Sequence, residues 1–372
     1  MSGNSKHIHR SAWRCPSNIA LVKYWGKRDF QKPMNPSLSF VLQNAFTETS
    51  VELHKNGDQK VAFYFDGKPG TFGERIEKYL EHVSGKLPWI SKYNFAIHSQ
   101  NSFPHSAGIA SSASSFGALA LCLTELDFAM SEKDAGTPDF WKEASELARM
   151  GSGSACRSVY PGFALWGQTQ LFESGSDEFA ISLTAGIHPV FEGLRDAILM
   201  VDSGTKSVSS STGHRLMDNH FFQRSRIAQA YENVNELYLA LLTGDLSKFI
   251  EVTETEALSL HAMMMTSSPS FILLKPNSLE LINRIRRFRE KAQIPVCFTI
   301  DAGPNIHLLY FQENELDVKA FIERELIQFC ENGKWMEDRI GGGPERLMSV
   351  SGSEIRNTGK IDLNSQPATR KP

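Results

Sequence analysis

A loop of small and hydroxyl-bearing residues runs from Pro104 to Ser112, between a strand-like run and a strongly apolar helix. Small side chains let backbone N–H groups approach an anion closely, and the start of a helix adds partial positive charge and unpaired donors. The loop therefore has the chemistry of a phosphate cradle, although no Gly-Lys-Ser/Thr closes it as in a Walker A loop. On composition alone, the alternative is a serine-rich cap on a buried helix.

Two further segments carry groups that suit anions. Residues 18–29, Asn-Ile-Ala-Leu-Val-Lys-Tyr-Trp-Gly-Lys-Arg-Asp, gather three basic residues and two aromatic residues directly after a strand-like run. This mixture favours an anion site with cation–aromatic contacts, and a solvated edge strand is the alternative. Residues 151–158, Gly-Ser-Gly-Ser-Ala-Cys-Arg-Ser, place Arg157 in a glycine turn after a helix. Its planar guanidinium can grip a carboxylate or a phosphate, and a helix-ending turn is the alternative.

A fourth segment, Asp-Ala-Gly-Pro-Asn at residues 301–305, lies between two strand-like runs. Asp, Gly, Pro and Asn are also the residues of ordinary turns, so this segment alone does not indicate a site. The segment could take part in catalysis through Asp301, whose carboxylate can orient or deprotonate a hydroxyl group within hydrogen-bond reach.

Taken together, the four segments resemble the diphosphomevalonate decarboxylase family of the GHMP kinase superfamily. The pattern Pro-x-x-x-Gly-Ile-Ala-Ser-Ser-Ala at residues 104–113 is similar to the phosphate-binding loop of the superfamily, and residues 18–29 read almost as they do in the family. The resemblance is colinear from about Ala12 to Pro344. Two departures are visible: Asn-Pro-Ser at residues 35–37 stands for the usual Asn-Ser-Ser, and residues 206–213 match only loosely.

The resemblance implies a two-part reaction on (R)-5-diphosphomevalonate. ATP, as co-substrate with Mg²⁺, phosphorylates the 3-hydroxyl, and loss of phosphate and CO₂ then gives isopentenyl diphosphate and ADP. The alternatives are a phosphomevalonate decarboxylase, a mevalonate 3-kinase that stops after phosphorylation, and a non-catalytic ligand sensor.

The resemblance also implies roles for individual residues. Asp301 is expected to act on the 3-hydroxyl, and Arg157 to hold the carboxylate and keep Asp301 ionised. Lys23 is expected near the transferring phosphate or Asp301, and Ser112 near the γ-phosphate. The predicted substrate contacts are Asn18, Tyr24, Trp25, Gly26, Lys27, Arg75, Ser152, Gly153, Ser154, Ala155, Cys156, Arg157, Ser210 and Ser211. The predicted ATP contacts are Pro104, Ser106, Ala107, Gly108, Ile109, Ala110, Ser111 and Ser112. No residue is predicted as a metal ligand.

The elements that must position these residues follow from hydrophobic periodicity. Predicted strands cover residues 19–24, 37–42, 51–53, 61–65, 95–99, 163–166, 168–173, 198–202, 296–300 and 307–311. Predicted helices cover residues 75–82, 113–126, 140–150, 224–242, 246–265, 278–293 and 317–330. The chain becomes more helical near residues 190–200. We therefore predict an α+β protein with domains at residues 10–192 and 193–347 and a disordered tail at 348–372. The family resemblance implies the GHMP kinase fold with the active site in the interdomain cleft.

Net charge and cysteine spacing indicate which kinds of binding partner to expect. The chain has 372 residues and a formal net charge of −3, which gives no sign of nucleic-acid binding. Its five cysteines are far apart and form no Cys-x-x-Cys pair, so we expect reduced thiols and neither a disulfide framework nor a zinc site. We expect no stretch that approaches the roughly 20 apolar residues of a membrane span. We expect a cytoplasmic enzyme of small-molecule substrates, and the resemblance implies a homodimer.

Overall fold

Two long antiparallel strands near the N-terminus form the centre of the fold. The computed structural model describes residues 9–55, 59–104, 109, 111–202, 204 and 210–348. Strand β1 (Arg10–Val22) pairs with β2 (Ser37–His54) from Arg10 opposite Glu52 to Val22 opposite Leu38, with two shifts of register. The first residues of β2 are buried on both faces, whereas its second half alternates between buried and partly buried positions. This change indicates that structure covers both faces of the strand pair only at one end.

Within the described residues, the strands form one sheet of eight strands and one of four. The larger sheet contains β1 and β2 with β3 (Val61–Phe65), β4 (Lys68–Pro69), β5 (Asn94–Asn101), β6 (Phe163–Trp166), β7 (Ala180–Ser182) and β12 (Glu345–Met348). The smaller sheet contains β8 (Leu194–Leu199), β9 (Cys297–Thr299), β10 (Ile306–Phe311) and β11 (Trp335–Arg339), in the order β11-β8-β10-β9. β12, the last strand among the described residues, thus returns to pair with β1.

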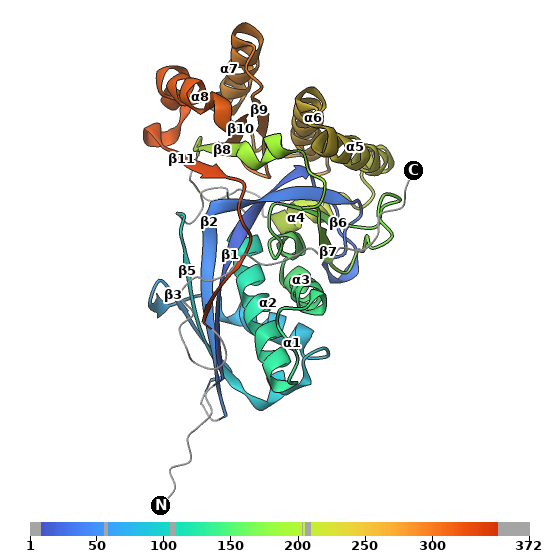
Figure 1. Cartoon of the computed structure of the whole chain (residues 1–372), viewed down its shortest axis with the longest axis vertical. Helices are drawn as coiled ribbons and strands as arrows, with labels where there is room; N and C mark the ends of the chain where they lie inside the picture. The colour runs from blue at the N-terminus through green and yellow to red at the C-terminus, as the bar shows by residue number, and fades with distance from the viewer. Residues whose placement is uncertain are drawn as a thin grey trace, which may run out of the picture.

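The helices divide between the two sheets (Figure 1). Helices α1 (Gly73–Val83), α2 (Ser111–Met130) and α3 (Pro138–Gly151) lie on one face of the larger sheet. Helices α5 (Gln223–Thr243), α6 (Leu246–Met265), α7 (Pro276–Ala292) and α8 (Glu315–Phe321) gather beside the smaller sheet at the other end of the molecule. The short α4 (Ser210–Arg215) lies between the two groups.

A shared core explains why one end of β1 and β2 is buried on both faces. The apolar residues at that end pack in one cluster with residues of β8, α5 and α6. The cluster includes Ile19, Leu21, Leu38, Phe40, Leu194, Ile198, Val234, Leu237, Phe249 and Val252. The predicted domain boundary at residues 192 and 193 therefore falls within one continuous core, and it stays a prediction.

A buried carboxylate also joins the two sheets. Asp338 of β11 is 1% exposed, and its oxygens accept the backbone N–H groups of Gln43, Asn44 and Ala45 at 2.8–2.9 Å. These N–H groups lie where the pairing of β2 with β1 skips from Phe46 to Val41, and a carboxylate is a strong acceptor for several of them at once. Because buried backbone donors need partners, Asp338 fixes the position of the smaller sheet against the larger one.

Most predicted elements are present, with three differences. Residues 168–173 form no strand, so that prediction was wrong. The last predicted helix contains a π-helical turn (Ile322–Leu326) and a 3₁₀ turn (Ile327–Phe329) after α8. Met348, which we assigned to the tail, ends β12, and residues 349–372 lie outside the described residues.

One helix in the described part of the chain is long and apolar enough to cross a membrane by length and composition. This helix is α2, so our expectation that no stretch approaches that length was wrong. The apolar window of α2 is 78% buried inside the protein, and the core helix of a soluble protein passes the same test. The finding is therefore weak evidence for a membrane span.

Candidate active site

Lys23 and Asp301 form an ion pair at the junction of the two sheets. Lys23 is the first residue after β1, and Asp301 follows β9 by two residues. The Lys23 Nζ atom lies 2.8 Å from the Asp301 Oδ1 atom. The lysine side chain is 2% exposed and the aspartate side chain 25% exposed. The pair thus presents an open carboxylate beside a buried ammonium group.

Arg157 lies close to this pair, in a 3₁₀ turn (Gly153–Arg157) that follows α3. Its Nε and Nη2 atoms donate to the Asn18 side-chain oxygen at 3.3 and 3.2 Å, and its Nη1 donates to Ser37. Burial lowers the pKa of the Arg157 guanidinium, and the charge of the nearby Asp301 acts in the opposite direction. Ser37, the last residue of the Asn-Pro-Ser segment that departs from the family pattern, therefore helps to hold Arg157.

Asn18 connects Arg157 to the serine turn. Its side-chain Nδ2 donates to the Ser154 carbonyl at 3.0 Å and to the Ser158 hydroxyl at 2.8 Å, while its oxygen accepts from Arg157. Asn18 is 2% exposed and belongs to β1. A rigid strand therefore fixes both the arginine and the turn that carries it.

Gly153 allows this turn to approach Tyr24 closely. A Cβ atom on Gly153 would lie 2.8 Å from the Tyr24 Oη atom and 2.9 Å from the Trp166 ring. The ring centroids of Tyr24 and Trp166 are 4.7 Å apart, in an edge-to-face arrangement. Burial raises the pKa of the Tyr24 phenol, so its hydroxyl stays protonated and able to donate a hydrogen bond.

Three basic residues, Lys27, Arg75 and Arg215, lie close to one another. The pKa of the Lys27 ammonium is lowered by burial and by the charges of Arg215 and Arg75. Arg75 of α1 also lies 5.0 Å above the Phe116 ring. Among the described residues, no carboxylate forms an ion pair with any of the three, so their like charges lack an anionic partner from the protein. Such a group favours a polyvalent anion.

A pocket of about 200 Å³ opens at the start of α2. Its apolar walls come from β3, β5, α1 and α2. They are interrupted by polar side chains of β2, β5 and α2 and by Arg75 of α1. The lining includes Phe63, Phe65, Ile97, Phe116, Thr49, Ser99, Asn101, Ser111 and Ser112. The Ser112 hydroxyl also lies 3.2 Å from that of Ser152, so the start of α2 and the turn after α3 are neighbours.

Both halves of the chain match models of one family. Residues 15–180 match the diphosphomevalonate decarboxylase-like N-terminal domain, and residues 197–361 match the mevalonate 5-diphosphate decarboxylase C-terminal domain. The diphosphomevalonate decarboxylase of Eremothecium gossypii is 30% identical over 332 residues, which cover 85% of this chain and 81% of that relative. The chain belongs to the diphosphomevalonate decarboxylase family.

Solved structures confirm the fold of this family member. The mevalonate diphosphate decarboxylase of Staphylococcus aureus aligns with a TM-score of 0.79 and 31% identity, over 91% of this chain and 98% of that one. A structure described as MDDEF in complex with MVAPP, AMPPCP and magnesium aligns with a TM-score of 0.77 and 30% identity, over 91% and 99%. The predicted α+β fold of the GHMP kinase type is confirmed, and the protein is a decarboxylating enzyme.

Some predicted contact residues of this decarboxylase are buried in apolar surroundings, one is exposed, and others lie outside the described residues. The Trp25 ring is 4% exposed and packs in an apolar cluster with Met217 and Leu260, so its side chain serves the core. Ala155 and Cys156 are fully buried, and Ile109 is 5% exposed in the shared core. Pro104 is exposed. Ser106, Ala107, Gly108, Ala110 and the side chains of Ser210 and Ser211 lie outside the described residues.

Three residues that contact this site in the family member were not predicted from the sequence. Arg215 joins Lys27 and Arg75, and the basic residue two positions beyond the loosely matching segment was the available signal. His214 accepts the Gly26 N–H at 3.0 Å through Nδ1, and its ring lies 4.3 Å from that of Tyr24. His261 lies 3.1 Å from the Asp301 carbonyl through Nε2. No sequence pattern distinguished either histidine.

Gly26 explains why His214 can reach this segment. Its φ of +87° is a left-handed conformation that favours glycine, and a Cβ atom would lie 2.7 Å from the Met34 sulfur. Burial, with a smaller effect from Lys27, lowers the His214 pKa to about 3, so the ring is neutral and Nδ1 remains an acceptor. The glycine and the neutral histidine together fix the backbone between Tyr24 and Lys27.

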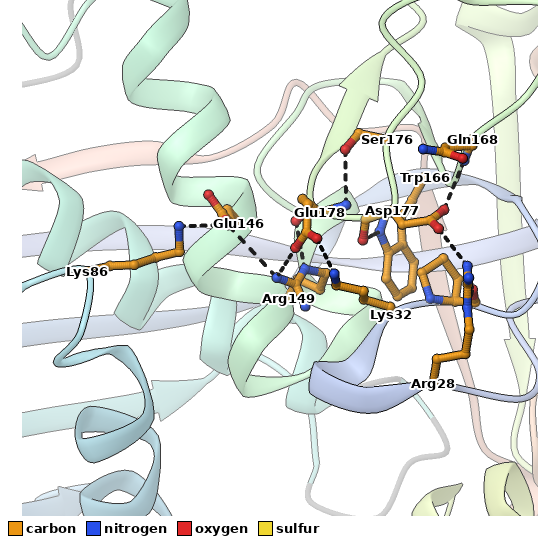
Figure 2. A network of polar contacts seen from close by, with 11 residues as sticks. Arg28, Lys32, Lys86, Glu146, Arg149, Trp166, Gln168, Ser176, Asp177 and Glu178 are labelled. Atoms are coloured by element: carbon orange, nitrogen blue, oxygen red, sulfur yellow. Dashed lines mark hydrogen bonds and ion pairs between the residues drawn. The ribbon is translucent and has the colours of Figure 1, made fainter.

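A polar network secures the chain beyond Lys27 (Figure 2). Arg28 pairs with Asp177 at 2.5 Å, and Lys32 pairs with Glu178. Glu178 also accepts from Arg149 of α3 at 2.8 Å, two residues before α3 ends. The network therefore links the two segments that carry the predicted substrate contacts.

Proposed function

We propose that this enzyme converts (R)-5-diphosphomevalonate and ATP into isopentenyl diphosphate, ADP, phosphate and CO₂. The observation that carries the proposal is the Lys23–Asp301 ion pair beside the buried Arg157, because it places an open carboxylate next to two cations. The related MDDEF structure holds MVAPP, AMPPCP and magnesium, which supports the same ligands for this chain.

In the first step, Asp301 orients the substrate 3-hydroxyl and accepts its proton as the oxygen bonds to the γ-phosphorus of ATP. The bond from the γ-phosphorus to the β,γ-bridging oxygen breaks at the same centre, and ADP leaves with that electron pair. Lys23 neutralises charge near the transferring group. In the second step the 3-phosphate leaves with the C–O electron pair. The bond between the carboxylate carbon and C2 then breaks, and its electrons form the new double bond while CO₂ departs.

Arg157 is suited to the carboxylate end of the substrate. Three of its five N–H groups are engaged by Asn18 and Ser37. Among the described residues, no further hydrogen bond engages its two terminal nitrogens, and a guanidinium can offer such nitrogens to the two oxygens of a carboxylate. A second group suits the diphosphate end of the substrate. It consists of Lys27, Arg75, Arg215, Tyr24 and the serine turn at residues 152–154. The charge count of this group is the reason to prefer a diphosphate over a monophosphate.

We place the ATP phosphates at the start of α2, next to Ser111 and Ser112, because a long helix offers free N–H groups and partial positive charge there. The neighbouring pocket suits the base, since it has aromatic and apolar walls with a few polar groups. Among the described residues, no three His, Cys, Asp or Glu side chains form a metal cluster. Mg²⁺ held mainly by the nucleotide phosphates fits this donor set, and it would neutralise the transferring phosphoryl group.

A substrate comparison tests the proposal. Purified protein is given ATP with mevalonate, its 5-phosphate or its 5-diphosphate, and both ADP and CO₂ are measured. We expect equal amounts of ADP and CO₂ with the diphosphate as the preferred substrate. CO₂ mainly from the monophosphate would make the enzyme a phosphomevalonate decarboxylase, and ADP without CO₂ would make it a 3-kinase. No turnover with any of the three would favour a ligand sensor.

Three further expectations belong to the same proposal. The ligands would occupy the junction between a domain of residues 10–192 and one of residues 193–347, as an interdomain cleft. The protein would work as a cytoplasmic homodimer with small molecules as its partners, without nucleic acid or a membrane. Light scattering at several protein concentrations tests the homodimer, and fractionation of cells that express the tagged protein tests the cytoplasmic location.

A further inference from the structure

The backbone of Lys23 is held by side chains rather than by a neighbouring strand. β1 ends at Val22, and the Lys23 N–H then donates to the Glu256 carboxylate at 2.8 Å. The Lys23 carbonyl accepts from Arg226 Nη2 at 3.2 Å and from Asn35 Nδ2 at 3.0 Å. The lysine that pairs with Asp301 is therefore fixed at its main chain by Glu256 of α6 and Arg226 of α5.

Arg226 and Glu256 are themselves a buried ion pair. Their side chains are 1% and 0% exposed, and two hydrogen bonds of 2.6 and 3.1 Å join them. The Glu256 Oε1 atom, which accepts from Arg226 Nη1, also accepts from Asn233 Nδ2 at 2.6 Å. Removing two charges from water is costly, and an apolar pair of similar volume is often as stable or more stable. The stability of the fold therefore does not explain why this pair is charged. The hydrogen bonds that the pair makes to the Lys23 N–H and carbonyl groups do explain it.

The same helix also reaches the other member of the catalytic ion pair. His261 of α6 is 2% exposed, and its Nε2 lies 3.1 Å from the Asp301 backbone carbonyl. A carbonyl can only accept, so Nε2 carries the hydrogen and donates it. Glu256 and His261 thus fix one partner of the ion pair each, from positions five residues apart on one rigid element.

We propose that α6, assisted by Arg226, is a positioning frame that sets the distance between Lys23 and Asp301. Glu256 and His261 act as positioning residues, since neither contacts the reacting atoms in this arrangement. The inference rests on the proposed function, in which Lys23 and Asp301 act together on the 3-hydroxyl and the transferring phosphate. A displacement of about 1 Å in such a pair can lower the rate a hundredfold.

The test compares two substitutions on the same helix. Glu256→Gln removes the charge that holds Lys23 and Arg226. Glu254→Gln is the matched control, because Glu254 is 5% exposed and pairs with Arg286 at 2.9 Å and Arg289 at 2.5 Å, and no bond joins it to Lys23 or Asp301 among the described residues. We expect Glu256→Gln to lower kcat by about tenfold to a hundredfold with little change in either KM. Glu254→Gln should keep kcat near the wild-type value.

A double variant and its crystal structure distinguish a loss of positioning from a folding defect as the cause of a lower kcat. Arg226→Met with Glu256→Leu removes both buried charges, so it should fold and still lose kcat to a similar degree. Glu256→Asp keeps the charge and should recover part of the loss. A crystal structure of the double variant should show Lys23 Nζ moved beyond about 3.5 Å from the Asp301 carboxylate.

The outcomes separate this inference from the proposed function. A kcat loss in Glu256→Gln no larger than in Glu254→Gln would overturn the inference, as would an unchanged Lys23–Asp301 distance in the double variant. Wild-type protein that turns over no mevalonate derivative would overturn the proposed function instead. In that case the crystallographic distance still decides whether the frame positions the pair.

Discussion

Lys23 and Asp301 are 278 residues apart in the chain, yet the lysine ammonium donates to the aspartate carboxylate at 2.8 Å. One residue follows the longest strand pair of the larger sheet, and the other follows an edge strand of the smaller sheet. The contact therefore exists only when both sheets are folded and joined. The environment of the Asp301 carboxylate therefore depends on the correct folding of both sheets.

Asp301→Asn should nearly abolish turnover. The amide keeps the shape of the side chain but cannot take the proton of the 3-hydroxyl, so kcat should fall by on the order of 10² or more. Substrate binding, measured by calorimetry, should survive because the basic group at Lys27 is untouched. A variant that retains most of its kcat would remove Asp301 from the mechanism.

Ser112→Ala should impair phosphoryl transfer more than binding of the diphosphate substrate. The hydroxyl lies at the start of α2, beside Ser152, where donors face the proposed phosphate site. Loss of one hydrogen bond to a charged phosphate should lower kcat or raise the KM for ATP by about tenfold. Unchanged ATP kinetics would return Ser112 to the role of a helix cap.

Arg157→Leu should uncouple the two parts of the reaction. Without the guanidinium the carboxylate is poorly held, so we expect ADP formation to exceed CO₂ release when both are measured in one assay. Arg157→Lys should restore only part of the coupling, because an ammonium group lacks the planar pair of donors. CO₂ release equal to ADP formation in the leucine variant would show that Arg157 does not hold the carboxylate.

Arg215→Met should weaken the preference for the diphosphate. A charge-assisted hydrogen bond contributes about 1.5–3 kcal/mol, so kcat/KM for the diphosphate should fall about tenfold or more, with a smaller effect on the monophosphate. Arg224→Met is the control, since Arg224 is an exposed arginine of the neighbouring helix α5. Equal losses for both substrates would place Arg215 away from the terminal phosphate.

Acid should destabilise the protein through His261. Burial lowers its pKa to about 4 in the folded protein, against about 6.5 when unfolded, so between these values only the unfolded chain binds the proton. The free energy of unfolding should therefore fall as the pH drops through this window, by up to about 3 kcal/mol from this residue. Urea unfolding at several pH values should show a smaller loss in His261→Gln. The same pH dependence in both proteins would refute the assignment.

The sequence by itself determined the local features of the site. Its strings at residues 18–29, 104–113, 151–158 and 301–305 indicated the family as a set, although each has an ordinary structural alternative when it is taken alone. The same local logic predicted most strands and helices, since apolar periodicity records which face each element buries. It failed at residues 168–173, where no strand forms.

Only the tertiary structure decided which of these residues meet. Trp25 adjoins Tyr24 in the chain, yet its ring is buried with Met217 and Leu260 because neighbouring side chains leave an extended backbone in different directions. Glu256 and His261 lie on an ordinary helix, and nothing local marks them. Their roles arise because α6 packs where β1 ends and β9 turns, and such long-range contacts depend on how complete elements pack together.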